Sequence, residues 1–110
     1  MDEARLEAML KEATAHCYDA EEEFWAMFST LLGRVSLPLQ ARVGGEAVTF
    51  VGLDGPASEP EVGIMAIVRR GDQEESVALG EVEVVEPDRV SVEWLAVYRY
   101  WRGKVWGGVG

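Results

Sequence analysis

The sequence predicts a single α+β domain in which a long N-terminal helix packs on a small antiparallel β-barrel and a short helix follows the barrel. Three successive patterns along the chain support this fold class. Apolar residues recur with helical spacing up to Gly33, alternate with polar residues after Pro38, and return to helical spacing from Trp94. The 110 residues suffice for one domain with one modest core. The predicted segments are 1–33 (helical), 37–86 (barrel), 90–103 (helix) and 104–110 (a frayed tail).

The first segment carries one apolar stripe of the kind that covers a core. Gly33 stands where a C-terminal cap is expected. An unbroken helix would be about 45 Å long, so the sequence leaves open whether the helix is continuous or broken near His16–Asp19. The spacing also fits a coiled-coil dimer, but the aromatic and alanine residues on the stripe favour packing against a sheet. The stripe consists of Leu6, Leu10, Ala13, Cys17, Ala20, Phe24, Met27 and Leu31.

Strand and turn signals alternate through the second segment. Asp54–Pro60 contains glycine, serine and two prolines and is predicted to be a loop, and Gly80 is expected to kink the last strand. Short strands joined by tight turns are typical of a small antiparallel barrel, here of the SH3-like kind. The predicted strands are Leu39–Val43, Ala47–Leu53, Val62–Arg70 and Ser76–Val85, with turns at Gly44-Gly45 and Gly71-Asp72.

The last predicted helix is marked by aromatic residues. Trp94, Tyr98 and Trp101 recur at spacings of four and three, and Gly103 is expected to end the helix. These aromatic side chains could form a cage for a ligand, but aromatics at helical spacing more often belong to a core. We therefore assign them to the core.

The composition is strongly acidic: 20 Asp and Glu residues stand against 10 Lys and Arg, for a net charge of −10. Clustered carboxylates are the main ligands of hard cations such as Ca²⁺, although acidic side chains also simply make a surface soluble. The charge argues against a nucleic-acid binder, because such proteins need basic patches. The lone Cys17 excludes an internal disulfide, and no segment has the apolar length of a membrane span. We expect a cytoplasmic monomer or weak dimer.

Three groups of acidic residues are candidate ligand sets. On a continuous helix, Glu12, His16, Asp19 and Glu23 would form one row beside the apolar stripe. In a strand, Glu81 and Glu83 would share a face, with Glu86 following; Arg69 or Arg70 on an adjacent strand could instead pair with them. The third group lies in the predicted loop and consists of Asp54, Glu59 and Glu61. Each of the three groups is also compatible with a merely solvated acidic surface.

Catalytic signatures are missing from the sequence. His16 and Cys17 are adjacent, and successive helical residues point apart, so the two cannot act as base and nucleophile. A partly buried, hydrogen-bonded His16 is favoured over a metal ligand, because zinc and di-iron sites require further His or Cys residues at fixed spacings. No EF-hand loop occurs either. We expect a protein that is not an enzyme.

The order of several short motifs resembles the small acidic calcium-binding proteins of the CcbP type, described in cyanobacteria. The resemblance covers most of the chain. The motifs are Tyr18-Asp19-x-Glu21-Glu22-Glu23, Leu37-Pro38-Leu39-x-Ala41-x-Val43, Val48–Leu53, Val77-Ala78-Leu79 with Glu81 and Glu83 after it, and Trp94-x-x-x-Tyr98-x-x-Trp101.

This resemblance implies a non-EF-hand calcium site in an acidic surface depression beside a small barrel. One departure weakens the match: Leu31-Leu32-Gly33-Arg34 stands where the family tends to have acidic residues, so a ligand of the family could be lost here. The positions that fall in the matching acidic segments are Asp19, Glu22, Glu23, Glu81 and Glu83, with Glu46 at a place where the family often has an acid.

The function expected from these observations is reversible calcium binding, as a buffer or a sensor. The alternative is a metal-independent protein-interaction module whose acidic surface is merely solvating, with the barrel edge or the aromatic C-terminal helix receiving an unknown protein partner.

Overall fold

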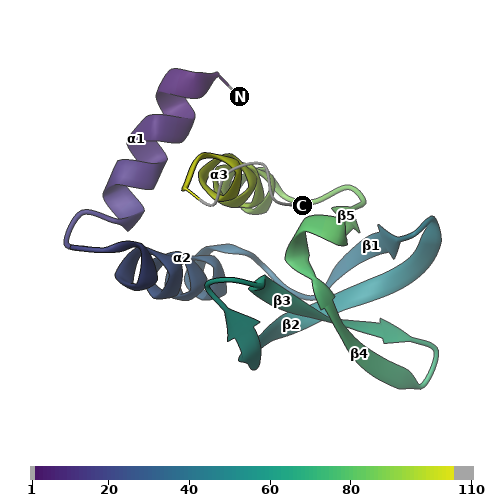
Figure 1. The fold of residues 1–110 in the computed structure, drawn as a ribbon. Coiled ribbons are helices and arrows are strands. Elements are labelled where there is room, and N and C mark those ends of the chain that lie inside the picture. Colours follow the sequence, from purple (N-terminus) through teal and green to yellow (C-terminus); the bar gives the residue numbers. More distant parts are fainter. Residues whose placement is uncertain (1, 106–110) are drawn as a thin grey trace. The chain divides into compact units, whose positions relative to one another are not determined.

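The structure is a computed structural model that describes residues 2–105 (Figure 1). The chain forms two compact units. The helical unit comprises Met1–Val35 and Arg89–Gly110, and the sheet unit comprises Ser36–Asp88. The α+β class is confirmed, with three α-helices in the first unit and an antiparallel sheet in the second. The packing of the N-terminal helix on the sheet stays a prediction. No helix within residues 2–105 combines the length and the apolar character needed to cross a membrane.

The N-terminal helical segment is broken, so the second of the two alternatives left open by the sequence is correct. Helix α1 spans Glu3–Ala13 and helix α2 spans Ala20–Arg34. At the end of α1, the hydroxyl of Thr14 donates to the carbonyl oxygen of Leu10 at 2.9 Å, and the backbone N–H of Thr14 donates to the same oxygen at 3.0 Å. These bonds satisfy a carbonyl that the ending helix would otherwise leave unpaired.

Both C-terminal helix ends differ from the prediction. Gly33 lies inside α2, and the cap is Val35, whose backbone N–H donates to Leu31 O. Helix α3 spans Arg89–Val105 and therefore continues past Gly103. Of the predicted tail, residues 104 and 105 are helical, and 106–110 lie outside the described residues.

The core of the helical unit is aromatic. Trp94 and Tyr98 are each 4% exposed and Trp101 is fully buried, so the cage interpretation is wrong and the core assignment is confirmed. The ring of Trp101 lies 6.2 Å from that of Phe24 and 6.1 Å from that of Tyr98. Of the predicted stripe, Leu10, Phe24, Met27 and Leu31 are buried.

The sheet unit holds five antiparallel strands in the order β4-β3-β2-β1-β5 (Figure 1). The two predicted hairpin turns are confirmed. Gly44 and Gly45 have φ of 59° and 85°, and Gly71 has φ of 58°, a conformation that glycine adopts without a steric penalty. Among the described residues, β4 and β5 lie at the two edges of the sheet, so the strands do not close into the barrel that the sequence predicted. The strands are β1 (Leu39–Val43), β2 (Glu46–Glu59), β3 (Gly63–Arg70), β4 (Gln73–Ala78) and β5 (Glu83–Val84).

The predicted loop Asp54–Pro60 is wrong for most of its length, because β2 continues to Glu59. The pairing with β3 is irregular between Asp54 and Glu59. Within this irregular stretch Ser58 is 2% exposed; its hydroxyl donates to Asp54 O at 2.7 Å and accepts from the backbone N–H of Met65 at 2.8 Å. The buried hydroxyl of Ser58 thus supplies hydrogen bonds to the backbone of Asp54 and Met65 where the strand pairing is irregular.

The fourth predicted strand, Ser76–Val85, is also wrong as one element. Strand β4 ends at Ala78, a 3₁₀ turn (η1) spans Leu79–Glu81, and β5 holds only Glu83–Val84. The expected kink at Gly80 is therefore a full turn that carries the chain from one edge strand to the other. Leu79 and Val82 are each 2% exposed, so the first residue of this turn and the residue that follows it are buried.

Candidate functional site

The predicted helix ligands lie at the first turn of α2, where two of them cap the helix. Asp19 is the N-cap residue, and its Oδ1 accepts from the backbone N–H of Glu22 at 2.8 Å. In return, Glu22 Oε2 accepts from the backbone N–H of Tyr18 at 2.8 Å. This reciprocal arrangement resembles a capping box, in which two side chains satisfy backbone donors that the helix start leaves unpaired.

Glu23, the third predicted helix ligand, has a different partner. Its Oε1 accepts from the indole Nε1 of Trp101 at 3.1 Å. Each of the three carboxylates therefore uses one oxygen in a hydrogen bond that stabilises the helical unit. The partial positive charge of a helix N-terminus stabilises carboxylates there and opposes a cation.

The row that would have joined Glu12 and His16 to these acids does not exist. Glu12 lies in α1, His16 lies in the turn after it, and Asp19 has extended backbone with φ of −145°. The row was drawn on a continuous helix, and the break at Thr14 removes its geometric basis. His16 is exposed, so the expectation of a partly buried histidine is wrong.

In the sheet unit, Glu46 is bound to an arginine. Arg70 forms ion pairs with Glu46 and with Glu75, the second at 3.0 Å, and the hydrogen bond that Arg70 donates to Glu75 raises the pKa of Arg70. Arg69 pairs with Glu74 at 2.8 Å. Both arginines, which lie on β3, thus pair with acids on β4 and at the start of β2. The alternative in which they neutralise Glu81 and Glu83 is wrong.

Glu81 and Glu83 are exposed on either side of the buried Val82. They do not share a strand, because Glu81 ends the 3₁₀ turn, so the argument from strand alternation does not hold. Within residues 2–105, neither side chain has a hydrogen bond or an ion pair. Glu86 follows with φ of 50°, a left-handed conformation that is uncommon outside glycine.

The predicted loop acids do not form a set. Asp54 Oδ1 accepts from the backbone N–H of Ala57 at 3.1 Å, and its Oδ2 accepts from the hydroxyl of Ser76. Asp54 thereby holds the irregular part of β2 to β4. Glu59 and Glu61 are exposed further along the chain.

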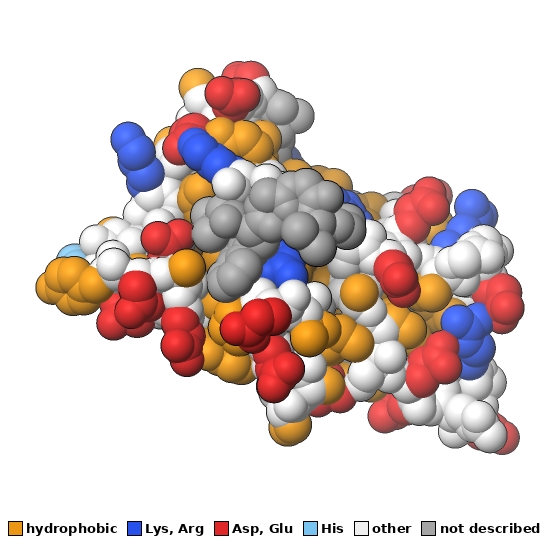
Figure 2. Space-filling view, viewed as in Figure 1, with side chains coloured by type: hydrophobic (Ala, Val, Ile, Leu, Met, Phe, Trp, Pro, Cys, Tyr) orange, Lys and Arg blue, Asp and Glu red, His pale blue; other side chains and the backbone are white. Residues whose placement is uncertain are grey.

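The net negative charge belongs mainly to the sheet unit. Asp and Glu outnumber Lys and Arg by eleven to three in residues 36–88, and by nine to seven in the rest of the chain. Figure 2 shows acidic side chains at many places on the face in view, separated by hydrophobic and neutral side chains. In the part of the chain that the structure describes, no three His, Cys, Asp or Glu side chains are grouped so that they could hold a metal ion.

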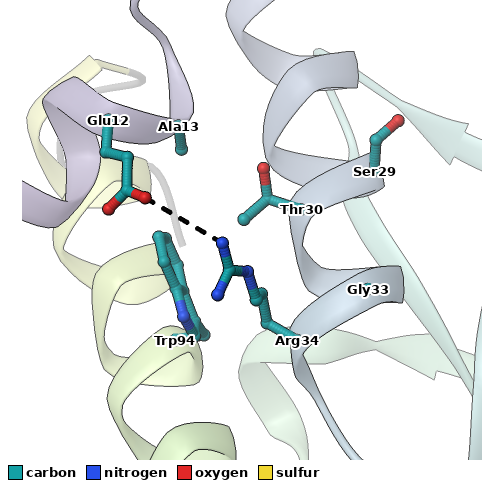
Figure 3. Close-up of a pocket in the computed structure, with 7 residues that line it drawn as sticks. All are labelled: Glu12, Ala13, Ser29, Thr30, Gly33, Arg34 and Trp94. Atoms are coloured by element: carbon teal, nitrogen blue, oxygen red, sulfur yellow. Dashed lines mark ion pairs between the residues drawn. The ribbon is translucent and has the colours of Figure 1, made fainter.

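The helical unit contains a pocket of about 240 Å³ that the sequence did not indicate (Figure 3). Glu12 Oε1 and Arg34 Nη2 lie 3.9 Å apart across it, and the guanidinium carbon of Arg34 lies 5.8 Å from the centroid of the Trp94 ring. Helical periodicity cannot reveal such a site, because its walls come from three helices. The lining residues are Glu12, Ala13, Ser29, Thr30, Gly33, Arg34 and Trp94.

Comparison with known proteins finds the same fold in two solved structures. The crystal structure of Anabaena CcbP superposes with a TM-score of 0.77 and 20% sequence identity, over 92% of this chain and 90% of that one. A calcium-binding protein in its calcium-binding form superposes with a TM-score of 0.78 and 15% identity, over 93% of this chain and 92% of that one. No protein-family model and no curated protein sequence matches the chain. The resemblance to CcbP-type proteins that the sequence motifs indicated is thus confirmed at the level of the fold.

Proposed function

We propose that this protein binds calcium ions reversibly at a carboxylate-lined surface site and acts as a calcium buffer or sensor. The observation that carries the proposal is the fold, which is shared over more than nine tenths of the chain with Anabaena CcbP and with a protein named for calcium binding. At 15% and 20% identity the likeness concerns the backbone, so the ligands have to be argued from the residues of this chain.

Glu81 and Glu83 are the best supported ligands. They are exposed, lie within three residues of each other, and have no partner within residues 2–105 that binding would have to break. They also lie in the unit where acids exceed bases by eleven to three. Calcium takes six to eight oxygen ligands, so two carboxylates cannot complete the site and other oxygens must contribute.

The other four predicted ligands are each engaged in the structure. Asp19, Glu22 and Glu23 keep one carboxylate oxygen free after their hydrogen bonds, so each could offer one ligand atom without losing its structural role. Glu46 would have to share or leave Arg70. Because the start of α2 opposes a cation, we rank the helix acids below Glu81 and Glu83.

A calorimetric titration with Ca²⁺ in an excess of Mg²⁺ tests the function. Specific coordination survives the competition, because Mg²⁺ demands a smaller octahedral site and loses its water reluctantly. We expect a dissociation constant of order 10⁻⁶ to 10⁻⁴ M, since no preformed loop encloses the ion. Loss of the binding heat in Mg²⁺, or an equal response to sodium at matched ionic strength, would mean charge screening and would refute the proposal.

The same titration separates the proposal from its alternative, a metal-independent interaction module. The burial of Trp94, Tyr98 and Trp101 removes the aromatic surface that was expected to receive a protein partner. The alternative surface, the edge of the sheet at β4 or β5, has no observation that favours a partner, so we propose no second function.

A further inference from the structure

The pocket of the helical unit contains two opposite charges that satisfy each other poorly. The distance between Glu12 Oε1 and Arg34 Nη2 is 3.9 Å. In a hydrogen-bonded ion pair the corresponding distance is about 2.7–2.9 Å. Both side chains are more than half exposed, at 66% and 54%. Within residues 2–105, neither has another charged partner. Carboxylate and guanidinium therefore both keep most of their hydrogen-bonding capacity for a ligand.

The remaining walls hold the guanidinium in place and leave space beside it. The ring of Trp94 lies against the guanidinium, an arrangement that favours a cation over the ring face. The hydroxyl of Thr30 donates to Ala26 O at 2.8 Å, which leaves its lone pairs as acceptors. A Cβ atom built on Gly33 would meet nothing within 4 Å, so this side of the pocket is open. Figure 3 shows Glu12 and Arg34 directed toward each other from α1 and α2.

The charges around the pocket determine which charges a ligand must carry. Glu12 and Ala13 are the last residues of α1, and Gly33 and Arg34 are the last residues of α2. The C-terminal end of a helix carries partial negative charge and attracts cations. A ligand with only a negative charge would be repelled by Glu12 and by both helix ends, and a ligand with only a positive charge would be repelled by Arg34.

We propose that this pocket binds a small zwitterion of the free α-amino acid class. The ligand's carboxylate accepts hydrogen bonds from the guanidinium of Arg34, which is suited to two parallel bonds. Its ammonium group lies at Glu12 and the end of α1. The volume of about 240 Å³ is below the range of pockets for drug-sized molecules, roughly 300–1,000 Å³, and suits a compact ligand.

The test is a titration of the full chain with L-leucine, followed through the backbone amide of Gly33 and the indole N–H of Trp94 in ¹⁵N-edited NMR spectra. Both signals should shift, with a dissociation constant of order 10⁻³ M, as expected for so small a ligand. N-acetyl-L-leucine lacks the ammonium charge and L-leucinamide lacks the carboxylate. Each should bind at least about tenfold more weakly, because a charge-assisted hydrogen bond is lost.

Three variants within the pocket and two controls outside it locate the binding. Glu12→Gln and Arg34→Gln should each weaken L-leucine binding about tenfold, and Glu3→Gln, on α1 but outside the pocket, should leave it unchanged. Gly33→Leu should fill the pocket and abolish binding. Gly103→Leu is its matched control, since Gly103 is also a helical glycine whose added Cβ meets nothing within 4 Å. Circular dichroism confirms that each variant is folded.

Three outcomes would overturn the proposal. The first is the absence of shifts at Gly33 and Trp94 with L-leucine at tens of millimolar. The second is equal binding of either one-charge analogue, which would show that the pocket recognises a single charge. The third is binding that survives Gly33→Leu in a folded protein.

Discussion

The indole nitrogen of Trp101 donates a hydrogen bond of 3.1 Å to Glu23 Oε1 and thereby joins α3 to the first turn of α2. Trp101 is fully buried, whereas Glu23 is half-buried. A residue proposed as a calcium ligand thus also satisfies the polar atom of the largest buried side chain in the helical unit. Stability and calcium affinity can be separated at this position, because an amide can replace the carboxylate as an acceptor but not as a charge.

Glu23→Ala should lower the free energy of unfolding by about 1–3 kcal/mol, because it leaves the buried indole N–H without its acceptor. Glu23→Gln keeps a carbonyl oxygen at the same place and should lose less than half as much. Urea unfolding followed by tryptophan fluorescence measures both values. Equal stability of the alanine and glutamine variants would show that the hydrogen bond contributes nothing.

The cap of α2 can be tested in the same way. Asp19→Ala should cost about 1 kcal/mol of stability, because the N–H of Glu22 loses its acceptor, whereas Asp19→Asn should cost a few tenths, since asparagine caps nearly as well. Glu21→Ala, a change in the same turn that removes no cap, is the control. If Asp19→Ala and Glu21→Ala were equally stable, Asp19 would not act as a cap in solution.

The turns of the sheet were predictable because their causes are local. Gly44, Gly45 and Gly71 adopt positive φ angles in the two hairpin turns. The strand ends at Val43, Glu46 and Arg70 were predicted to within one residue, whereas β4 begins three residues before the predicted Ser76. The break between α1 and α2 also has a local signal, the pairing of Asp19 with Glu22. The continuous apolar spacing across it masked that signal, which is why the sequence left two alternatives open.

The rest depends on contacts between residues far apart in the sequence. Asp54–Pro60 has the composition of a loop. Most of it nevertheless forms strand, because the hydroxyl of Ser58 accepts a hydrogen bond from the backbone N–H of Met65 on the neighbouring strand. Likewise, the pocket between Glu12, Arg34 and Trp94 exists only once three helices meet. The candidate ligands could be named from motif resemblance, but which acids are free depends on where Arg69 and Arg70 lie, and no spacing rule supplies that.

Stability should fall at acidic pH partly through Glu93. The bidentate hydrogen bond from Arg5 lowers the pKa of Glu93 below its ordinary value of 4.5; the charges of Arg5 and Arg89 add to this effect, and partial burial opposes it. A group whose pKa is lowered by folding stabilises the protein above its unfolded pKa, and this contribution is lost as the pH falls through the folded value. The unfolding free energy should therefore decrease below about pH 4.5.

The variant Glu93→Gln should make that decrease shallower, and Glu21→Gln, which removes an exposed acid without such a partner, should leave it nearly unchanged. Urea unfolding at a series of pH values measures the slopes. Identical slopes for Glu93→Gln and the parent protein would show that the Arg5–Glu93 contact does not persist in solution.

Two glycines should respond oppositely to alanine. Gly33 lies inside α2, and an added Cβ meets nothing within 4 Å, so Gly33→Ala should raise stability by about 0.5 kcal/mol through helix propensity. Gly71 has φ of 58°, so Gly71→Ala should lower stability by about 1 kcal/mol. Thermal unfolding of the two variants compares them directly. A loss of stability in Gly33→Ala would contradict the helical assignment of that residue.

The last prediction concerns the calcium ligands. Replacing Glu81 and Glu83 together by glutamine should weaken Ca²⁺ binding at least about tenfold, since two ligand charges are removed without a change of shape. Fold stability should be unaffected, because neither carboxylate has a partner within residues 2–105. The matched control combines Glu59→Gln with Asp72→Asn, which removes two exposed charges from the same unit and should change the affinity less than twofold (roughly the effect of altered screening).

Combining Asp19→Asn with Glu23→Gln tests the helix acids on the same scale. If the acids at the start of α2 are secondary ligands, this pair should weaken binding less than the Glu81 and Glu83 pair does. Isothermal titration calorimetry of the three double variants ranks them. Should the helix pair be decisive and the sheet pair neutral, the site would lie at the start of α2, and one free oxygen each of Asp19 and Glu23 would be enough to overcome the unfavourable field of the helix end. Equal weakening by all three pairs would instead assign the calcium response to net charge alone.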